Sequence, residues 1–283
     1  MDEILDNLRQ LERKLGGTLG LYATPLLTVP GRPDGDVLRY NESERFPAAS
    51  TIKVFVLLTL LEQVDKDEAS LDEEVTLTEA DQVTGSGVLK SLSAGRAYTL
   101  LDLATLMIIV SDNTATNLVI DRVGVGEVND TCRRHGWNGT ELAGKLQTGA
   151  GHTRSSMTCP RDLADYFVRL WRGDLLPPRL TAVAQAIFRK QQLTDQLGRE
   201  LDFDSYSTET GESRLTIASK SGSLRGVRND AGVIEAADSA YVVAIMTKGC
   251  PDERFHPDNL GSRIVSSVSR LVFDRYARSL SAG

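Results

Sequence analysis

The feature that most constrains this 283-residue chain is an almost wholly apolar run from Val54 to Leu61. The run is longer than a typical strand, so we expect a buried helix. Ser50 stands where this helix would begin and Lys53 follows three residues later, which places the hydroxyl and the amine on one helical face, one turn apart. A helix start also offers backbone N–H groups and a positive dipole end, both suited to a developing oxyanion.

Ser50 and Lys53 allow two interpretations. In the first, burial lowers the pKa of the Lys53 amine, which can then take a proton from a nucleophilic serine. In the second, Ser50 only caps the helix, and Lys53 runs along apolar surface to leave its amine in water. A Ser-x-x-Lys pattern is common and does not decide between them.

Composition excludes several classes of protein. The hydrophobic content of 41% and the charged content of 25% are ordinary for a globular chain. The net charge of −7 and the pI of about 5.1 argue against a nucleic-acid or membrane partner. No apolar stretch reaches the roughly 18 residues that span a bilayer. The first residues are acidic and amphipathic, unlike a signal peptide, so we expect a cytoplasmic protein, or a secreted one if a leader has been removed.

Metal and cofactor sites are not indicated. The three cysteines are an odd number without metal-like spacing, and the three histidines are far apart. These residues are Cys132, Cys159, Cys250, His135, His152 and His256. We therefore expect reduced thiols, no metal and no organic cofactor.

Strand patterns occur near both ends of the chain, and helix patterns fill its middle. The expected strands are 18–23, 37–40, 215–222, 231–235 and 241–246, and the expected helices are 2–15, 50–61, 100–110, 114–123, 160–171, 179–190 and 260–280. This order predicts an α+β fold (an α/β sandwich), with an antiparallel sheet built from both termini and flanked by helices. We expect a single domain, 1–283, in which 1–46 with 213–283 forms a sheet subdomain and 47–212 an all-helical subdomain.

Two further polar motifs interrupt apolar sequence. Ser111-Asp112-Asn113 ends a buried helix, and taken alone it indicates a turn with an N-cap. Lys220-Ser221-Gly222 ends a strand, and taken alone it indicates an edge turn. Together with Ser50 and Lys53, however, the motifs supply a nucleophile with its base, a hydroxyl that can pass on a proton, and a cation for a substrate carboxylate.

The order of the three motifs resembles class A β-lactamases and penicillin-binding proteins. Ser50 and Ser111 are 61 residues apart, and 109 residues separate Ser111 from Lys220. Flanking sequence shares the resemblance, in the stretches 46–50, 85–89, 105–117, 160–163 and 220–232. Ser221 stands where threonine is more usual, which keeps the hydroxyl. The resemblance covers roughly residues 18–275 and implies a β-lactamase/transpeptidase-like fold.

The resemblance implies catalytic roles for three side chains. Ser50 would be the acylated nucleophile, Lys53 its base or proton relay, and Ser111 the relay to the departing amine. The backbone N–H groups of Ser50 and Ser223 would form the oxyanion hole.

The resemblance also implies residues that bind the substrate. Asn113 would hold the substrate amide, and Lys220 with Ser221 would bind its carboxylate. Gly222 and Ser223 would offer a strand edge for backbone pairing. Arg228 would add charge to the carboxylate pocket, although a plain surface arginine is the alternative.

One departure concerns the loop of residues 138–154. Class A β-lactamases carry Glu-x-x-Leu-Asn in this loop, and its glutamate activates the deacylating water. Here the only acid is Glu141, in a different sequence setting, and the signature is absent. His152 is a candidate for the deacylation base, because imidazole titrates near neutral pH; an exposed loop histidine is the alternative.

The sequence thus predicts a serine hydrolase of the class A β-lactamase type, acting on a small β-lactam, amide or ester through an acyl-enzyme on Ser50. Two alternatives belong to other classes. One is an acyltransferase or cyclase, or a small-ester hydrolase, in a biosynthetic pathway; the other is a slowly deacylating β-lactam-binding protein.

Overall fold

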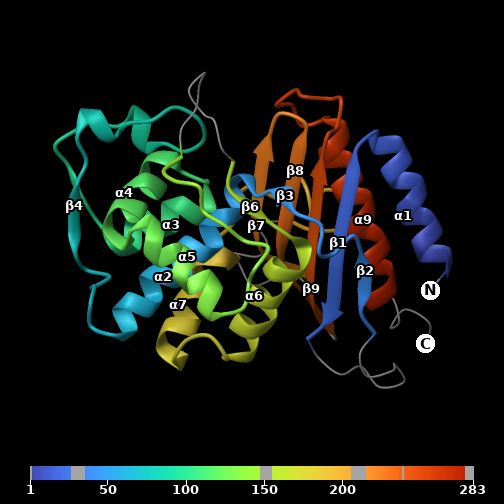
Figure 1. Ribbon diagram of the computed structural model, residues 1–283, viewed down its shortest axis with the longest axis horizontal. Coiled ribbons are helices and arrows are strands. Elements are labelled where there is room, and N and C mark those ends of the chain that lie inside the picture. The colour runs from blue at the N-terminus through green and yellow to red at the C-terminus, as the bar shows by residue number, and fades with distance from the viewer. Residues whose placement is uncertain (1, 27–35, 147–154, 205–214, 238, 278–283) are drawn as a thin grey trace.

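An antiparallel sheet lies between two layers of helices (Figure 1). The computed structural model describes residues 2–26, 36–146, 155–204, 215–237 and 239–277. Within these residues the main sheet has five strands in the order β2-β1-β9-β8-β7. They are β1 (Thr18–Pro25), β2 (Leu38–Tyr40), β7 (Leu215–Leu224), β8 (Val227–Ala236) and β9 (Ser239–Lys248). The predicted α+β class and the antiparallel sheet from both ends of the chain are confirmed.

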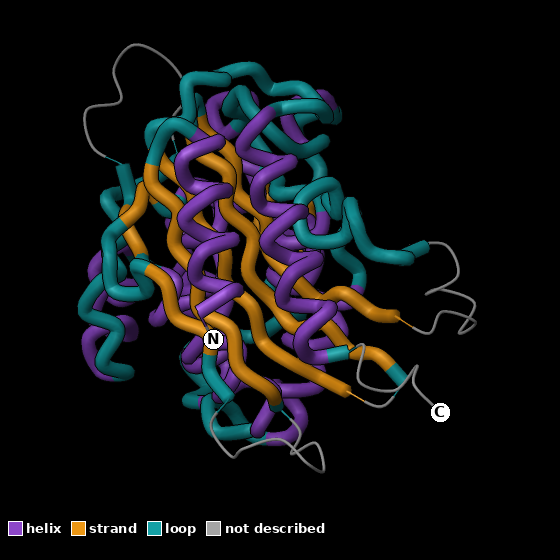
Figure 2. Tube along the Cα trace, turned by 90° about the vertical axis from the view of Figure 1, so that its right-hand side faces the viewer, coloured by secondary structure: helices purple, strands orange, loops and turns teal. Residues whose placement is uncertain are grey.

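Helices α1 (Asp2–Leu15) and α9 (Leu260–Tyr276) cover one face of the sheet (Figure 2). Leu8 and Leu15 of α1 are buried, as are Ile264, Val268 and Val272 of α9. Their spacings of seven and four residues place each set on one side of its helix. These stripes pack on alternate side chains of the strands, so the two terminal helices and the sheet share one core.

In the described part of the chain, six helices form the layer on the opposite face. They are α2 (Lys53–Asp65), α3 (Leu100–Ile109), α4 (Asn113–Val123), α5 (Val125–Arg134), α6 (Pro160–Arg172) and α7 (Pro178–Arg189). Helix α2 is deeply enclosed, since every residue from Lys53 to Leu61 is buried. Phe55 packs edge-on against Trp137 and Tyr166, with ring centroids 5.1 and 5.7 Å apart. Helices α3, α4, α5 and α7 also contact α2, so neighbouring helices hold it in place.

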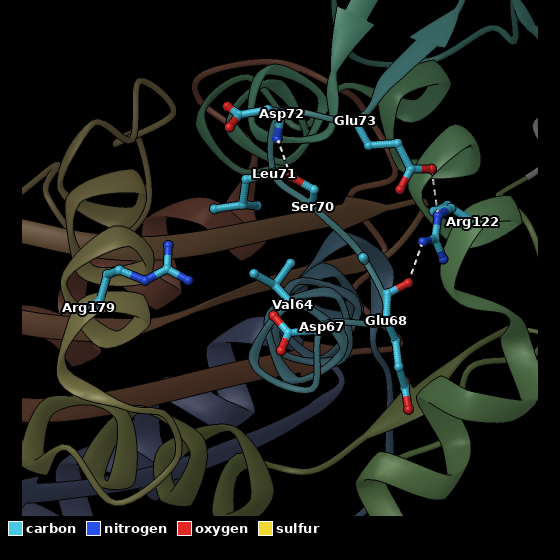
Figure 3. A pocket seen from close by; sticks show the side chains of 10 residues that line it. Val64, Asp67, Glu68, Ser70, Leu71, Asp72, Glu73, Arg122 and Arg179 are labelled. Atoms are coloured by element: carbon cyan, nitrogen blue, oxygen red, sulfur yellow. Dashed lines mark hydrogen bonds and ion pairs between the residues drawn. The ribbon is translucent and has the colours of Figure 1, made fainter.

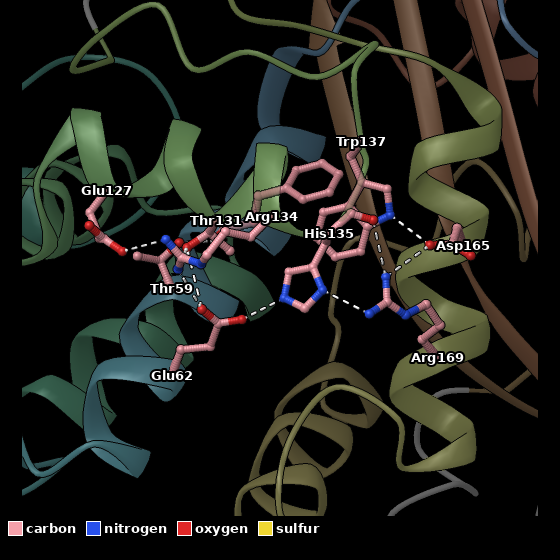
Figure 4. A network of polar contacts seen from close by, with 10 residues as sticks. Thr59, Glu62, Glu127, Thr131, Arg134, His135, Trp137, Asp165 and Arg169 are labelled. Carbon is pink, nitrogen blue, oxygen red and sulfur yellow. Dashed lines mark hydrogen bonds and ion pairs between the residues drawn. The ribbon is translucent and has the colours of Figure 1, made fainter.

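A polar network braces α2 against α6 (Figure 4). Glu62 of α2 lies 2.6 Å from Nε2 of His135, and Arg169 of α6 donates to Nδ1 of the same ring at 2.8 Å. Trp137 stacks on this imidazole and donates its indole N–H to Asp165 at 2.7 Å. The network fixes the spacing of the two helices at the end of α2 away from Ser50.

Several short elements were not predicted from the sequence. They are α5, the strands β3 (Phe46–Pro47), β4 (Glu74–Thr76), β5 (Ala97–Thr99) and β6 (Met157–Thr158), and the 3-10 helices η1 (Ala49–Ile52), η2 (Glu79–Asp81) and η3 (Leu89–Ser91). Strands of two or three residues cannot show an alternating pattern. Helix α5 buries Thr131 and Cys132 beside Val128, so its inner face is only weakly apolar. No helix in the described part of the chain is long and apolar enough to cross a membrane.

Candidate active site

Ser50 lies in the 3-10 helix η1, which packs against β7 and β8. The preceding residue, Ala49, has a φ of 49°, in the left-handed region that is strained for a residue with a side chain. The N-cap positions of η1 and α2 are Ala48 and Ile52, and neither makes a side-chain capping bond. The interpretation of Ser50 as a helix cap does not match this geometry.

The Lys53 side chain is fully buried, so its amine does not extend into water. Nζ donates to the Ser111 carbonyl oxygen at 2.8 Å and lies 3.0 Å from both Ser111 Oγ and Asn113 Oδ1. Burial lowers the pKa of Lys53 well below its ordinary value; the nearby Lys220 charge lowers it further, and Asp112 opposes this shift. A lowered pKa favours the neutral form of the amine, which is the form that can accept a proton.

Asp112, which lies beside these groups, has a structural role. Its Oδ1 accepts from Ala115 N at 2.9 Å, which caps α4. Its Oδ2 accepts from the N–H groups of Val88 and Leu89 at 2.6 and 2.8 Å. The capping interpretation of the second motif therefore applies to Asp112. Ser111 precedes it with a φ of 55°, and this turn directs the Ser111 carbonyl and hydroxyl toward the buried amine of α2.

The third motif lies inside the edge strand β7, which continues to Leu224, so the expectation that the strand ends at Gly222 is wrong. Lys220 is fully buried and donates to the Ser221 carbonyl oxygen at 2.7 Å. Burial lowers the pKa of Lys220 to about 7, and the neighbouring Asp230 carboxyl opposes this shift. A Cβ on Gly222 would lie 2.8 Å from the Ser50 nitrogen. The absence of a side chain at Gly222 thus allows the nucleophile segment to dock on the strand.

Arg228 lies on β8, opposite Ser223 in the strand register. Its side chain is buried, with its guanidinium carbon 5.2 Å from the Phe255 ring centroid. The guanidinium donates to three backbone carbonyls, those of Leu224, Val227 and Arg254. Arg228 is therefore not the plain surface arginine of the alternative, and three of its five N–H groups are already engaged.

The candidate deacylation base, His152, falls outside the described residues. The only acid of the loop, Glu141, lies 3.6 Å from the Arg45 guanidinium in a half-exposed ion pair. It also pairs through its backbone with Met157, so Glu141 belongs to the β6 side of the loop.

Asn117 fastens the described end of this loop to the site. Its Nδ2 donates to the Leu146 carbonyl at 2.9 Å, and its Oδ1 accepts from Leu146 N at 2.7 Å. Asn117 follows Asn113 by one turn on α4, so the loop backbone at Leu146 is held one helical turn from the residue that contacts Lys53.

Sequence reasoning assigned no role to Asn117 or Asn229, although both are buried and bridge distant segments. The sequence gives only a weak signal for them. Each is an amide side chain within a helix or a strand, where a buried polar group needs a hydrogen-bond partner. The motif residues Ser50, Lys53, Ser111, Asn113, Lys220, Ser221 and Gly222 converge around η1, β7 and the start of α4.

Two surface cavities lie away from these motifs. One, of about 480 Å³, lies at the C-terminal end of α2 (Figure 3). Its polar lining comprises Asp67, Glu68, Ser70, Asp72, Glu73, Arg122 and Arg179. The other, of about 510 Å³, lies between Trp137 and α6. Within the described ranges no group of three or more histidine, cysteine or acidic side chains could hold a metal ion.

Known proteins resemble the chain along most of its length. The model of the family described as the β-lactamase enzyme family matches residues 3–276. A β-lactamase of Streptomyces cellulosae is 31% identical over 245 residues, which cover 83% of this chain and 73% of that protein.

Solved structures resemble it as well. A β-lactamase from Sphaerobacter thermophilus is similar with a TM-score of 0.84, 31% identity and 96% of both chains covered. The structure of PBP-A has a TM-score of 0.82 and 30% identity, and covers 96% of this chain and 95% of that one. A variant of PBP-A, with a TM-score of 0.79, 30% identity and 96% of both chains covered, is described as an acyl-enzyme complex with penicillin G.

Proposed function

The chain belongs to the β-lactamase enzyme family, and from this premise we propose that it is a class A type serine hydrolase that opens a β-lactam, or a related amide or ester, through an acyl-enzyme on Ser50. The similarity to β-lactamases along most of the chain supports the reaction class. The penicillin G acyl-enzyme of PBP-A supports a β-lactam as the small-molecule substrate.

One observation carries the proposal most directly. The fully buried amine of Lys53 lies one turn after Ser50 and is shared between Ser111 Oγ and Asn113 Oδ1, each 3.0 Å away. Burying an amine destabilises the folded protein, so a lysine in this position calls for a functional explanation. Transfer of a proton from the Ser50 hydroxyl to the Ser111 hydroxyl through the Lys53 amine explains why these side chains lie together, with Asn113 holding the amine in place.

Acylation follows from this arrangement. Ser50 Oγ attacks the substrate carbonyl carbon and gives its proton to the neutral amine of Lys53, while the carbonyl oxygen takes up the displaced electron pair. The backbone N–H groups of Ser50 and Ser223 stabilise that oxyanion. When the C–N bond breaks, Ser111 Oγ donates a proton to the leaving nitrogen and receives one from Lys53 Nζ. Both relays thereby return to their starting protonation states.

Substrate binding uses the two strands beside the nucleophile. Lys220 and Ser221 bind the substrate carboxylate, and the buried position of Lys220 strengthens that attraction because little water screens it. Asn113 keeps its Nδ2 close to the Thr84 carbonyl at 3.2 Å, and the substrate amide would compete for the same side chain. Arg228 adds positive charge next to Ser223.

The loop supports a second candidate function, a slowly deacylating enzyme or β-lactam-binding protein. Hydrolysis of the acyl-enzyme needs a base for the attacking water. The only acid in residues 138–154, Glu141, is engaged with Arg45. An acyl-enzyme without an efficient base would persist, or would pass its acyl group to an added amine instead of water.

The test is intact-protein mass spectrometry after mixing with a penicillin or a cephalosporin, sampled from seconds to hours. For the penicillin we expect a mass increase equal to the whole molecule, because opening its ring expels no fragment. The Ser50→Ala variant is the matched control and should show no increase.

Each outcome assigns a function. An adduct that forms and clears means a β-lactamase, and one that persists favours the second candidate. An adduct that clears faster with an added amine means acyl transfer. An adduct that survives in Ser50→Ala, or its complete absence with both β-lactams and with activated esters, would exclude the proposed chemistry.

A further inference from the structure

Asn229 is a fully buried amide on β8 that faces the nucleophile segment. It pairs in register with Gly222 of β7 and with Met246 of β9. Residues directly opposite one another on an antiparallel pair project from the same face of the sheet. Asn229 therefore shares the face on which the missing Gly222 side chain admits Ser50.

Every hydrogen-bonding function on the Asn229 side chain that the structure shows is directed at backbone. Nδ2 donates to the carbonyl oxygens of Pro47 and Ala48 at 2.9 and 3.2 Å. Oδ1 accepts from Thr247 N at 3.1 Å. One end of the amide is thus fixed to the central strand β9, and the other holds the two peptide groups that lead into η1.

These two peptide groups decide where the Ser50 nitrogen points. Ala49, between them and Ser50, has its φ at 49°. The Ala48 carbonyl also accepts from Thr51 N at 3.2 Å and from Thr51 Oγ1 at 2.7 Å, which closes the turn around Ser50. A strained turn persists only when its surroundings hold it.

We propose that Asn229 is a positioning residue for the acylation reaction: by holding the Pro47 and Ala48 carbonyls against β8 it sets the position of Ser50 Oγ and of the Ser50 N–H in the oxyanion hole. This inference rests on the proposed function, because it assigns the residue to acylation of Ser50. Asn229 acts through the backbone and does not touch the substrate. Displacement of a reacting group by about 1 Å can cost about 10²-fold in rate.

The chain offers a matched control for the loss of a buried amide. Asn259 is also fully buried, its Nδ2 also donates to two backbone carbonyls, those of Asp252 and Arg254, and its Oδ1 also accepts one backbone N–H, that of Ser262. It caps α9, and these side-chain hydrogen bonds all stay within residues 252–262, away from the nucleophile segment 47–51. Asn229→Ala and Asn259→Ala therefore delete the same set of hydrogen bonds at different places.

The experiment compares acylation rate constants of the two alanine variants and the wild type, at a temperature at which all three are folded. Folded fractions come from circular dichroism, and reactive fractions from titration with a fluorophosphonate probe. We expect Asn229→Ala to acylate about 10- to 100-fold more slowly with a penicillin, and Asn259→Ala to stay within about twofold of the wild type. Affinity for a boronic acid, which forms a tetrahedral adduct with the serine, should fall in parallel.

A third variant, Asn229→Asp, separates positioning from general loss of packing. An ionised carboxylate cannot donate to the Pro47 and Ala48 carbonyls, whereas a protonated one can donate to one of them. The acylation rate of Asn229→Asp relative to Asn229→Ala should therefore increase as the pH falls. A role in packing alone would leave this ratio independent of pH.

The outcomes are distinguishable from failure of the proposed function. Equal rates for Asn229→Ala and Asn259→Ala, with Asn229→Asp independent of pH, would overturn the positioning role while Ser50 acylation stands. If Asn229→Ala does not fold, the pH-dependent ratio of Asn229→Asp to the wild type decides. If the wild type forms no Ser50-dependent adduct with any of the three probes, the proposed function itself fails.

Discussion

The amine nitrogen of Lys53 lies 3.0 Å from the hydroxyl oxygen of Ser111, although the two residues are 58 positions apart in the chain. Both side chains are almost completely enclosed, with exposed fractions of 0% and 3%. Water can therefore neither screen their interaction nor readily replace either group as a proton carrier. This contact joins the predicted base of the first motif to the predicted relay of the second.

Replacement of Lys53 by methionine should lower the acylation rate constant by about 10²- to 10⁴-fold, the usual contribution of a positioned acid or base. Methionine keeps most of the buried volume but has no amine to accept the Ser50 proton. The measurement is the rate of adduct formation with a penicillin, followed by mass spectrometry.

Lys53→Arg is the informative companion to this variant. Arginine retains a positive charge and several donors but does not lose a proton in proteins. We expect it to acylate as slowly as Lys53→Met. A nearly wild-type rate for Lys53→Arg would mean that residue 53 contributes charge alone, and would contradict its role as a base.

Binding of a substrate carboxylate should weaken as the pH rises through about 7. Burial lowers the pKa of Lys220 to about 7, so its amine is positive below that pH and becomes neutral above it. The dissociation constant of a carboxylate-bearing β-lactam should then increase by up to about tenfold for each pH unit above 7. Calorimetry with Ser50→Ala measures binding without acylation. A methyl ester of the same β-lactam is the control; an equal pH dependence for the ester would refute the assignment to Lys220.

A carboxylate introduced at Leu146 should accelerate deacylation. Asn117 clamps the Leu146 backbone one turn from Asn113, so a side chain at this position belongs to a loop segment that is fixed against the site. A fully aligned general base accelerates a reaction by about 10²-fold or more. Because the introduced glutamate is not aligned by evolution, we expect Leu146→Glu to shorten the lifetime of a penicillin adduct by a smaller factor, at least about tenfold. The readout is the decay of the adduct mass after excess penicillin is removed.

Lys145→Glu is the control for that experiment, since it introduces the same carboxylate one residue away, at an exposed position. It also removes the ion pair of Lys145 with Asp121 and changes the net charge by two, so it is a stringent control for added negative charge. Its adduct should decay at the wild-type rate. Equal acceleration in both variants would show that added negative charge, rather than position 146, is responsible.

Addition of one methyl group at Gly222 should impair both folding and acylation. The new Cβ would lie 2.8 Å from the Ser50 nitrogen and 3.0 Å from the Thr51 nitrogen, so backbone has to move. We expect Gly222→Ala to lower the melting temperature and to slow acylation by about 10²-fold or more. Gly126→Ala, within α5 and with open space around the new Cβ, should instead be neutral or stabilising by up to about 1 kcal/mol. A Gly222→Ala protein with wild-type acylation would show that η1 does not depend on this close approach.

The fold was predictable to the extent that each element shows its own pattern. The stripes of α1 and α9 and the long apolar run of α2 are local signals, and so are the short apolar runs within the strands β7 to β9. The strands β3 to β6 were missed because two or three residues cannot show an alternating pattern, and helix α5 was missed because its inner face is only weakly apolar. His152 remains a prediction, since it lies outside the described residues.

The sequence by itself determined the side chains to which we assign the chemistry, because Ser50, Lys53, Ser111 and Lys220 belong to motifs whose order and spacing are visible in one dimension. Only the tertiary structure decided how readily the two lysines lose their protons. The pKa values of Lys53 and Lys220 are lowered because both amines are buried, and burial depends on the neighbours that pack around them rather than on the motif. The structure likewise reveals Asn117 and Asn229, since a hydrogen bond from a side chain to a distant backbone leaves no periodic trace in the sequence.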